Sequence, residues 1–561
     1  MPNFLESIFA QLKRAEDRVV LREIHGEKIV SLTGGELLEQ VQRVRAYLHR
    51  SGLQPGDRCA LLAANSIQWA AFDLALMAEG AIVVPLYSRQ APGELAGMMK
   101  DCQPRLLFVG DAALGEGVAQ AWPEAPHRVL FEEVLQQPAA PQVPADAPNP
   151  RPDSDIATII YTSGTSGEPK GVCLSVGNVT HMISCTTERL DQLMGETHEP
   201  DRVFHYLPFN FAASWIVLLT YLTRESVLTL STDLNKLADE IRLASPHYFL
   251  NVPTLLERVR RGVEEALSKR PALIRSLFAK ARDAWQRLHV GRGRALDAFW
   301  LGLGRKLIFG KIKERFGSHL RTLICGSAPL APETQQFFLM LGIPVLQGYG
   351  LTETTGICTL DDPRVPVEPG YVGTEITGIE MKIAENEEIV VRGPHIFTGY
   401  WNRLEETARV LQDGWFHTGD QGEVNVRRNW RISGRIKNLI ILNSGHNIAP
   451  EPIEEKIARF LPAAQQVVVV GNGRGYLCAL VTGAVERAAA RAVLDSLNPE
   501  LPHYRQIRNF AVIPEAFTIE NGLLTANGKL RRSAINARYA SEINAMYDAQ
   551  GTREAVIGKS A

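Results

Sequence analysis

The sequence predicts an α/β protein that has a large N-terminal domain, with layered sheets and helices in several subdomains, and a small α+β C-terminal domain. Three observations lead to this fold class. The chain has 561 residues, which is more than one hydrophobic core usually organises. Strand-like apolar runs alternate with amphipathic stretches through most of it, as is typical of layered α/β folds. After Gly434 a separate group of strand-like and helix-like segments begins, which indicates a second domain.

The N-terminal elements follow from the periodicity of apolar residues. Residues 33–50 place apolar side chains at helical spacing, and the short apolar runs at residues 60–63, 81–86 and 106–109 are typical of strands. Residues 136–152 are rich in proline and alanine. They are therefore expected to form an exposed connection before the next strand.

The C-terminal region predicts a small α/β module of about 125 residues, within the usual size of a domain. Residues 467–470 and 510–513 are typical of strands, and residues 487–497 of a helix. Glycines at residues 471, 473 and 475 follow the first of these strands and invite comparison with a dinucleotide-binding loop. Tyr476 stands where that fingerprint needs its third glycine. A turn between two strands is the better interpretation.

Charge is balanced over the whole chain but not along it. There are 60 basic and 62 acidic residues, a net charge of −2, which argues against nucleic acid as a partner. Residues 254–321 nevertheless contain 17 Lys and Arg against 6 Asp and Glu, a local charge of +11. Apolar residues alternate with these bases, so amphipathic helices with cationic faces are expected. Such faces are either simply solvated or lie on an anionic membrane surface.

The ends and the cysteines indicate a cytoplasmic protein, with peripheral contact at the inner membrane face as an open alternative. The N-terminus lacks the pattern of a secretory signal. The best apolar run, residues 212–222, is too short for a bilayer span, which needs roughly 20 residues. The seven cysteines contain no C-x-x-C pair. They are therefore expected to be buried, reduced thiols rather than metal ligands.

The strongest local signal is at residues 159–171, Ile-Ile-Tyr-Thr-Ser-Gly-Thr-Ser-Gly-Glu-Pro-Lys-Gly. An apolar strand leads into hydroxyl side chains and glycines and then into Lys170. Glycines permit close approach of the backbone, and successive amides can bind an anion. The segment suits a polyphosphate. It is not a Walker A loop, because Pro169-Lys170-Gly171 stands where that pattern needs Gly-Lys-Ser/Thr.

Four more motifs follow in order. They are Gln-Gly-Tyr-Gly-Leu-Thr-Glu at residues 347–353, Gly-Trp-Phe-His-Thr-Gly-Asp at 414–420, Gly-Arg-Ile-Lys-Asn at 434–438 and Asn-Gly-Lys-Leu at 527–530. With the glycine-rich loop, they resemble the signature motifs of the adenylate-forming superfamily of acyl-CoA synthetases, adenylation domains and luciferases. The resemblance covers essentially the whole chain. It implies that a carboxylate is joined to the α-phosphate of ATP, with release of pyrophosphate.

The resemblance also implies a role for each matching residue. The β- and γ-phosphates of ATP would be held by Thr162, Ser163, Gly164, Thr165, Ser166, Gly167 and Lys170. The adenine would lie against Gly326, Ser327, Ala328, Tyr349 and Gly350. Thr352 would contact the phosphates, Glu353 would bind Mg²⁺, and Asp420 and Arg435 would face the ribose and the nucleotide. The catalytic residues would be Lys529, which stabilises charge in the transition state, together with Glu353 and Thr165.

A domain boundary with a hinge at Lys437 is implied in the same way. Residues 1–436 would form the AMP-binding domain, which includes the basic insertion at about residues 254–321. Residues 437–561 would form the mobile domain that carries Lys529. The face of that domain that admits the thiol of coenzyme A (CoA) would carry Ser444, Gly445, His446 and Asn447. The cofactors implied are ATP, Mg²⁺ and CoA as co-substrate.

Several passages resemble the long-chain fatty acyl-CoA synthetase branch of the superfamily. Residues 206–215 depart from it, because Phe211 replaces a histidine and Ser214-Trp215 replace a Glu-Arg pair. Phe209, Phe211 and Trp215 are expected to line the acyl pocket, although an ordinary core helix would show the same pattern.

The expected activity is formation of a fatty acyl-AMP followed by its thioester with CoA. One alternative is an acyl-AMP ligase that loads a carrier protein, and another is an aryl or medium-chain acyl-CoA ligase. A non-catalytic lipid-binding scaffold is disfavoured by the intact Lys170, Glu353, Asp420 and Lys529. The oligomeric state stays open, with a dimer as one option.

Overall fold

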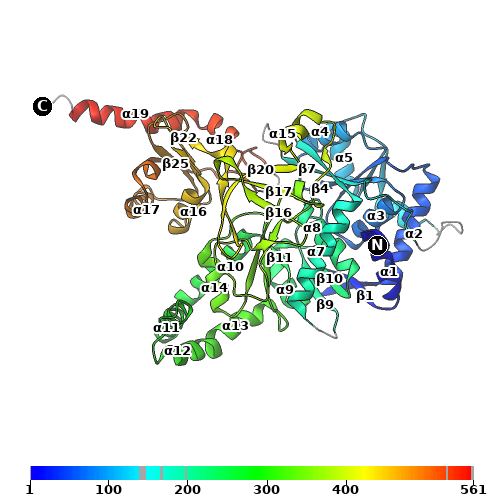
Figure 1. Ribbon diagram of the computed structural model, residues 1–561, viewed down its shortest axis with the longest axis horizontal. Coiled ribbons are helices and arrows are strands. Elements are labelled where there is room, and N and C mark those ends of the chain that lie inside the picture. The colour runs from blue at the N-terminus through cyan, green and yellow to red at the C-terminus, as the bar shows by residue number, and fades with distance from the viewer. Residues whose placement is uncertain (1, 138–146, 164–168, 196–198, 526–527, 558–561) are drawn as a thin grey trace. The chain divides into compact units, whose positions relative to one another are not determined.

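The computed structural model describes residues 2–137, 147–163, 169–195, 199–525 and 528–557 (Figure 1). The chain forms two compact units. The large unit comprises Met1–Met381, Val391–Phe416 and Val424–Arg431; the small unit comprises Lys382–Val390, His417–Glu423 and Ile432–Ala561. The expected α/β class is confirmed. The boundary and hinge expected at Lys437 stay a prediction.

The largest sheet of the large unit has seven strands in the order β18-β8-β7-β4-β3-β5-β6. The strands are β3 (Arg58–Ala63), β4 (Ile82–Tyr87), β5 (Leu106–Val109), β6 (Arg128–Leu130), β7 (Ile156–Ser163), β8 (Pro169–Ser175) and β18 (Gly399–Tyr400). The strands from β6 to β7 are parallel, whereas β8 and β18 are antiparallel to their neighbours. The three expected strands at residues 60–63, 81–86 and 106–109 are all part of this sheet.

Helices cover and connect these strands. They are α2 (Gly34–Arg50), α3 (Ile67–Ala78), α4 (Pro92–Cys102), α5 (Ala112–Ala121) and α6 (Phe131–Leu135). The helix expected at residues 33–50 is α2. It begins after Thr33 because the Thr33 hydroxyl accepts a hydrogen bond from the amide of Glu36 (3.2 Å), while the Glu36 carboxylate accepts one from the amide of Thr33 (2.8 Å).

Two more sheets complete the large unit's layers, in the orders β2-β1-β10-β9 and β11-β12-β13-β14-β15. Their strands are β1 (Val19–His25), β2 (Lys28–Thr33), β9 (Asp201–His205), β10 (Ser226–Ser231), β11 (Leu250–Asn251), β12 (Leu323–Cys325), β13 (Val345–Tyr349), β14 (Thr359–Leu360) and β15 (Thr374–Glu375). The accompanying helices are α1 (Phe4–Arg14), α7 (Val176–Met194), α8 (Ala212–Thr223), α9 (Leu237–Ala244) and α14 (Pro332–Met340).

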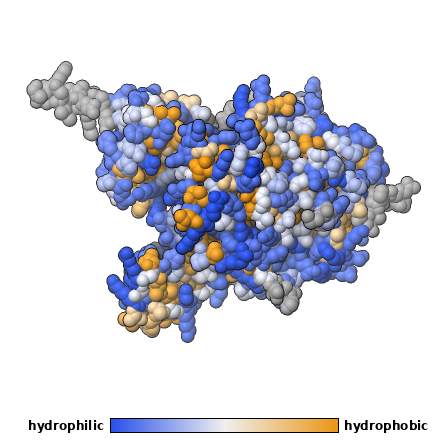
Figure 2. Space-filling model, viewed as in Figure 1, coloured by the Kyte–Doolittle hydropathy of each residue, from blue (hydrophilic) through white to orange (hydrophobic). Residues whose placement is uncertain are grey.

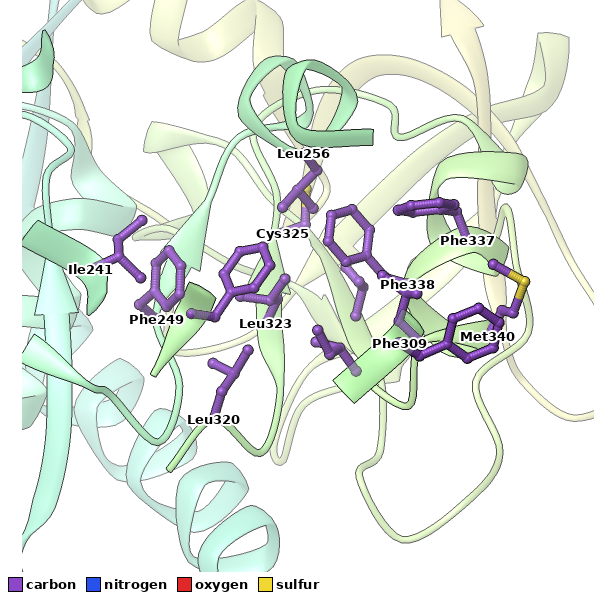
Figure 3. Packing of buried hydrophobic residues seen from close by; sticks show 14 of the residues in the cluster. Ile241, Phe249, Leu256, Phe309, Leu320, Leu323, Cys325, Phe337, Phe338 and Met340 are labelled. Atoms are coloured by element: carbon purple, nitrogen blue, oxygen red, sulfur yellow. The ribbon is translucent and has the colours of Figure 1, made fainter. Parts of the chain in front are cut away.

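The basic segment is helical, as its amphipathic pattern indicates. It forms α10 (Pro253–Ser268), α11 (Ala272–His289), α12 (Asp297–Gly304), a π-helical turn η2 (Arg305–Phe309) and α13 (Gly310–Lys313) (green in Figure 1). One face of these helices packs into the core around β11–β13, where Phe309 of the π-helical turn joins the same cluster as Phe338 and Met340 of α14 (Figure 3). The insertion is therefore anchored to the large unit by apolar contacts.

An ion pair fixes the hairpin between α11 and α12. Nη2 of Arg287, near the end of α11, lies 2.6 Å from Oδ1 of Asp297, the first residue of α12. The amide of Arg294 also donates to Asp297 Oδ2 (2.8 Å). The hydrogen bond from Arg287 lowers the pKa of Asp297 to about 2, so this carboxylate stays ionised and keeps its partners at neutral pH.

The small unit has its own core. Its sheets are β22 (Ile440–Ile441) with β23 (Asn447–Ile448), and β24 (Val467–Val470), β25 (Leu477–Thr482) and β26 (Ile507–Ile513) in sequence order. Its helices are α16 (Glu451–Phe460), α17 (Arg487–Leu497), α18 (Arg532–Arg538) and α19 (Ala540–Ile557). The expected elements at residues 467–470, 487–497 and 510–513 are found, and glycines 471–475 form the turn between β24 and β25.

A further sheet has the order β16-β17-β20-β19, and β21 pairs with β20. Its strands are β16 (Glu380–Ile383), β17 (Glu388–Arg392), β19 (Leu411–Gln412), β20 (Trp415–Val424) and β21 (Trp430–Arg435), with helix α15 (Leu404–Val410) directly before β19. The motifs at residues 414–420 and 434–438 therefore lie on its long strand β20 and at the end of β21.

The expectations about the cysteines and about membrane-spanning helices can be compared with the structure. All seven cysteines are buried free thiols; burial raises the pKa of Cys59 and of Cys173 to about 12, which keeps both protonated. Within the part of the chain that the structure describes, no helix combines the length and the apolar character needed to cross a bilayer.

Candidate active site

The glycine-rich segment is the connection between β7 and β8. These two strands are antiparallel, with Thr162 opposite Lys170 and Ser163 opposite Pro169. The hairpin thus places Thr162, the first hydroxyl residue of the expected phosphate loop, beside Lys170, where β7 ends and β8 begins in the largest sheet. Gly164, Thr165, Ser166 and Gly167 lie outside the described residues, so their expected contacts with phosphates stay predictions.

Lys170 lies between a carboxylate and an aromatic ring. Its ammonium group pairs with Oε2 of Glu406 in α15 and lies 5.2 Å from the ring centre of Tyr400 in β18. The Lys170 side chain is only 17% exposed. The hydrogen bond from Lys170 lowers the pKa of Glu406. A cation held in this way is available to an anionic ligand if that ligand takes the place of Glu406.

Tyr400 connects this lysine to Glu353. The Tyr400 hydroxyl donates a hydrogen bond to Oε1 of Glu353 (2.8 Å), and the amide of Phe397 donates to the backbone carbonyl of Glu353 (2.9 Å). Burial raises the pKa of Tyr400, and the neighbouring Glu353 raises it further. The phenol therefore remains a donor at all physiological pH values and fixes one oxygen of a half-buried carboxylate.

Tyr400 and Glu406 were not expected from the sequence. Their contacts with Lys170 and Glu353 depend on the pairing of β18 with β8, in which Tyr400 lies opposite Val172. The sequence Gly399-Tyr400-Trp401 has no hydroxyl-rich or glycine-rich pattern that would have pointed to it. We name Lys170, Glu353, Tyr400 and Glu406 the charged cluster.

The residues expected around adenine are brought to one sheet edge. β12 and β13 are parallel neighbours, so Gly326 after β12 and Tyr349 at the end of β13 leave the sheet at the same edge. A Cβ atom on Gly326 would lie 3.2 Å from the carbonyl oxygen of Gly348, and one on Gly350 would lie 2.4 Å from that of Gly356. Tyr349 is half-buried, and Ser327 and Ala328 are exposed. This edge suits a planar ligand.

Thr352 lies three residues after Tyr349, just beyond the end of β13. It begins the single helical turn η4 (Thr352–Thr354), which also holds Glu353. The turn is closed at its start because the amide of Leu351 donates to the hydroxyl of Thr354 (2.8 Å). Thr352 and Glu353 are therefore consecutive residues of one short, closed turn.

Asp420 and Arg435, both in the small unit, form an ion pair. Nε of Arg435 lies 2.7 Å from Oδ1 of Asp420, and the carboxylate is only 3% exposed. The amide of Asp420 donates to the hydroxyl of Thr418 (3.1 Å), which fixes the backbone here. The arginine orients the Asp420 carboxylate, whose remaining lone pairs can accept hydrogen bonds from hydroxyl groups.

The other expected residues of the small unit are exposed. Lys437 lies in the short helical turn η6 (Ile436–Asn438). Ser444, Gly445, His446 and Asn447 form the end of the β22–β23 hairpin, where the Ser444 hydroxyl and Nδ1 of His446 are 2.8 Å apart. The amide of Thr525 donates to the Lys529 carbonyl (2.8 Å), and Lys529 is exposed.

The residues expected in the acyl pocket divide into two kinds. Phe209 and Trp215 are fully buried, and the Trp215 indole donates to Oδ2 of Asp73 (2.8 Å). Burial raises the pKa of Asp73 to about 7. Phe211 is only partly buried, with its ring 6.1 Å from that of Tyr87. Phe209 and Trp215 thus pack the core, and Phe211 is the one with exposed surface for a ligand.

Comparison with known proteins identifies the family. The model of the AMP-binding enzyme family matches residues 8–401, and that of the AMP-binding enzyme C-terminal domain matches residues 437–551. The chain belongs to this family of AMP-binding enzymes. It is therefore an adenylate-forming ligase of the acyl-CoA synthetase family, as its motifs indicate.

Individual relatives are distant but match along most of their length. Long-chain-fatty-acid–CoA ligase FadD15 of Mycobacterium bovis is 27% identical over 97% of both chains. Long chain acyl-CoA synthetase 7, peroxisomal, of Arabidopsis thaliana is 29% identical over 92% of this chain and 81% of its own length. O-succinylbenzoate coenzyme A synthetase (MenE) of Bacillus subtilis, solved with ATP and magnesium ion, has a TM-score of 0.74 at 22% identity, covering 95% of this chain and 99% of MenE.

The charged cluster fits a magnesium–ATP complex. Mg²⁺ is usually held by one or two carboxylates together with substrate phosphates, not by a cage of protein ligands. Among the described residues no three His, Cys, Asp or Glu side chains gather as metal ligands, whereas Glu353 offers a single fixed carboxylate near Lys170. When bound, Mg²⁺ would neutralise phosphate charge, and Tyr400 would hold Glu353 in place as its ligand.

Replacing Tyr400 with phenylalanine tests this arrangement. Tyr400→Phe removes the bond that orients Glu353 while keeping the ring beneath Lys170. Loss of such a support typically weakens metal binding by about tenfold or more. We expect a corresponding rise in the Mg²⁺ concentration that gives half-maximal ATP–pyrophosphate exchange.

Tyr248→Phe is the matched control, because it also removes a tyrosine–carboxylate bond, from Tyr248 to Asp201 (2.7 Å), in another sheet. An unchanged Mg²⁺ requirement in Tyr400→Phe, or an equal shift in both variants, would contradict the assigned role.

Proposed function

We propose that this chain activates a fatty acid in two steps and that it prefers acids with a long acyl chain. The carboxylate is first joined to the α-phosphate of ATP to give acyl-AMP and pyrophosphate, and the acyl group then passes to the thiol of CoA. The observation that carries the proposal is the charged cluster: Lys170 and Glu353 lie at the ring and the hydroxyl of one tyrosine, beside the β7–β8 hairpin.

The chemistry explains why such groups are needed. An anionic carboxylate must approach a highly anionic triphosphate, so the site has to neutralise charge and hold the reacting atoms in line. In the proposed mechanism Lys170 exchanges Glu406 for the phosphates, and the half-buried position of the lysine strengthens this attraction. Asp420 accepts the ribose hydroxyls. Lys529 stabilises charge on the carboxylate and the α-phosphate.

The preference for a long acyl chain rests on the relatives. FadD15 is named a long-chain-fatty-acid–CoA ligase and synthetase 7 a long chain acyl-CoA synthetase, and they are 27% and 29% identical to this chain. The departures at Phe211 and Trp215 lie in the segment expected to border the acyl pocket, so the accepted chain length is what the experiment must measure. A carrier protein as acceptor, or an aryl or medium-chain acid as substrate, is therefore an outcome that the experiment must be able to reveal.

The decisive experiment is pyrophosphate release measured over carboxylic acids from C2 to C20 and over aromatic acids, with and without CoA. We expect release with long-chain acids and thioester formation only when CoA is present. Preference for short or aromatic acids would contradict the substrate class. Acyl-AMP that accumulates in the presence of CoA would favour a carrier protein, and no release with any acid would contradict the ligase itself.

A substitution of Lys529 separates the two steps. If Lys529 acts only in adenylation, Lys529→Ala should reduce pyrophosphate release from fatty acid and ATP by at least about a hundredfold and leave thioester formation from supplied acyl-AMP unchanged. Lys456→Ala is the control, because Lys456 is a lysine of the same unit that pairs with Glu500 on the surface (2.7 Å). Equal loss of both steps in Lys529→Ala would refute this division of labour.

We further propose that the insertion docks on an anionic lipid surface, where fatty acids partition. Leu288, Val290, Leu296 and Phe299 surround the turn between α11 and α12 and are exposed, Val290 and Leu296 by 64% each. Figure 2 shows apolar residues gathered over this lobe. Arg292 and Arg294 lie in the same turn and are also exposed. Apolar side chains beside arginines are the combination that binds the interface of an anionic bilayer.

Flotation with vesicles tests this docking. The full chain should float with vesicles that contain anionic lipid, less so as salt concentration rises, and Leu296→Glu/Phe299→Glu should remain in the bottom fraction. Leu234→Glu/Leu243→Glu serves as control, because these two leucines are similarly exposed elsewhere on the large unit. Equal recovery with neutral and anionic vesicles, or recovery with neither, would contradict the proposal.

A further inference from the structure

Glu406 occupies the place on Lys170 that a phosphate is expected to take. Its Oε2 pairs with the Lys170 ammonium group, and both side chains are partly buried, 28% and 17% exposed. A carboxylate on a lysine that binds phosphates has the same sign of charge as the ligand. It therefore competes with the ligand for one cation, in surroundings where partial burial strengthens the attraction.

The backbone around Glu406 is fixed to β18. The Thr407 hydroxyl accepts a hydrogen bond from the amide of Tyr400 (2.9 Å) and donates one to the carbonyl of Arg403 (2.8 Å). These bonds join the first turn of α15 to the strand that carries Tyr400. Glu406 therefore stays within reach of Lys170, and a ligand can displace its carboxylate by rotation of the side chain alone.

A second cation lies beside Glu406. Nη1 of Arg403 is 3.6 Å from Oε1 of Glu406, whereas Lys170 pairs with Oε2. The two oxygens of one carboxylate thus have different partners. When an anion takes Lys170, the pair with Arg403 still neutralises Glu406, which a partly buried carboxylate requires. The cluster therefore has two arrangements, and in both of them Lys170 and Glu406 have a partner of opposite charge.

We propose that Glu406 is a built-in competitor of the polyphosphate, which holds Lys170 before ATP binds, turns to Arg403 when ATP is bound, and returns to Lys170 as pyrophosphate leaves. The identity of the anion rests on the proposed function. Because the ligand must displace an ion pair, it binds less tightly than Lys170 alone would allow, and weaker binding mostly means faster dissociation. Glu406 acts through Lys170, so it is a positioning residue that sets the affinity for nucleotide and product.

Calorimetric titration of magnesium–ATP into the full chain, without a carboxylic acid, tests the competition directly. We expect Glu406→Gln to bind ATP about tenfold more tightly than the wild type, because no ion pair is displaced, and Glu406→Asp, which keeps the charge, to gain less. AMP lacks the β- and γ-phosphates, so its affinity should not change. Glu405→Gln is the matched control, because it removes the same charge from the same turn, from a carboxylate that pairs with Arg409 (3.6 Å).

A substitution of Arg403 should move the affinity in the opposite direction. Arg403→Gln removes the partner of the displaced carboxylate, so ATP should bind about tenfold less tightly. Arg409→Gln is the control, because it removes a positive charge from the same region and leaves the Arg403–Glu406 pair in place. In the Glu406→Gln background, Arg403→Gln should cause no further loss, since no carboxylate then needs a partner. A merely structural role would not give opposite signs.

Steady-state kinetics then measure the effect on the product. In Glu406→Gln the KM for ATP and the inhibition constant of pyrophosphate should both fall, the latter by about tenfold, because both ligands contact Lys170. The value of kcat should not rise, since Glu406 touches no reacting atom. A variant with a disturbed fold would not be inhibited more strongly by the product, and AMP bound with wild-type affinity shows that the variant is folded.

The outcomes separate this inference from the proposed function. Equal affinity for ATP in the wild type and Glu406→Gln, weaker binding in this variant, or equal tightening in Glu405→Gln overturns the competition and leaves the ligase reaction standing. A loss from Arg403→Gln that persists in the Glu406→Gln background overturns the role of Arg403 as second partner. If the wild type activates no acid, the proposed function fails, and the ATP titrations still decide whether Glu406 competes for Lys170.

Discussion

The pairing of β18 with β8 is the contact on which the chemistry of the large unit depends. It is only two residues long, Gly399 with Cys173 and Tyr400 with Val172, and adjoining it the Thr398 hydroxyl donates to the Cys173 carbonyl across 225 residues of chain (3.2 Å). Closing so long a loop is entropically costly. The buried sheet supports the pairing from one side, since β8 is already held by β7 along its length.

This short pairing sets the electrostatics of the charged cluster. The ring of Tyr400, the last residue of β18, lies against Lys170, and its hydroxyl donates to Glu353. One side chain therefore positions both the cation expected to bind phosphates and the carboxylate expected to bind Mg²⁺. Glu406 neutralises Lys170 from the adjoining helix α15. A partly buried ammonium group without a counter-charge would be costly. The ion pair therefore keeps Lys170 stable and in place until an anionic ligand competes for it, which Glu406 permits because its carboxylate remains partly exposed.

Local sequence patterns predicted the parts of the structure that local interactions decide. The strand at residues 106–109 and the helix at residues 487–497 have the expected bounds, because apolar periodicity acts over a few residues. Gly326 and Tyr349 were expected near each other only from the resemblance of their motifs, and in the structure the parallel pairing of β12 with β13 brings them to one edge. The contribution of Tyr400 depends on pairing across the whole large unit, which no local pattern encodes. Trp215 carries the same apolar signal in a core helix as in a ligand pocket, and its partner Asp73 lies far away in sequence.

The charge distribution shows how an overall balance can conceal two different surfaces. The insertion concentrates +11 in residues 254–321, yet its inner face is held by the apolar cluster around Phe309 and Phe338. Folding of the insertion therefore depends on burial, and its positive charge is left for the outer face. The leucine and phenylalanine side chains exposed there would lower their free energy if another surface removed them from water. A near-neutral net charge is thus compatible with a strongly local electrostatic attraction, because a surface at short range responds to the charges within about one Debye length, roughly 8 Å in physiological salt, and not to the sum over the chain.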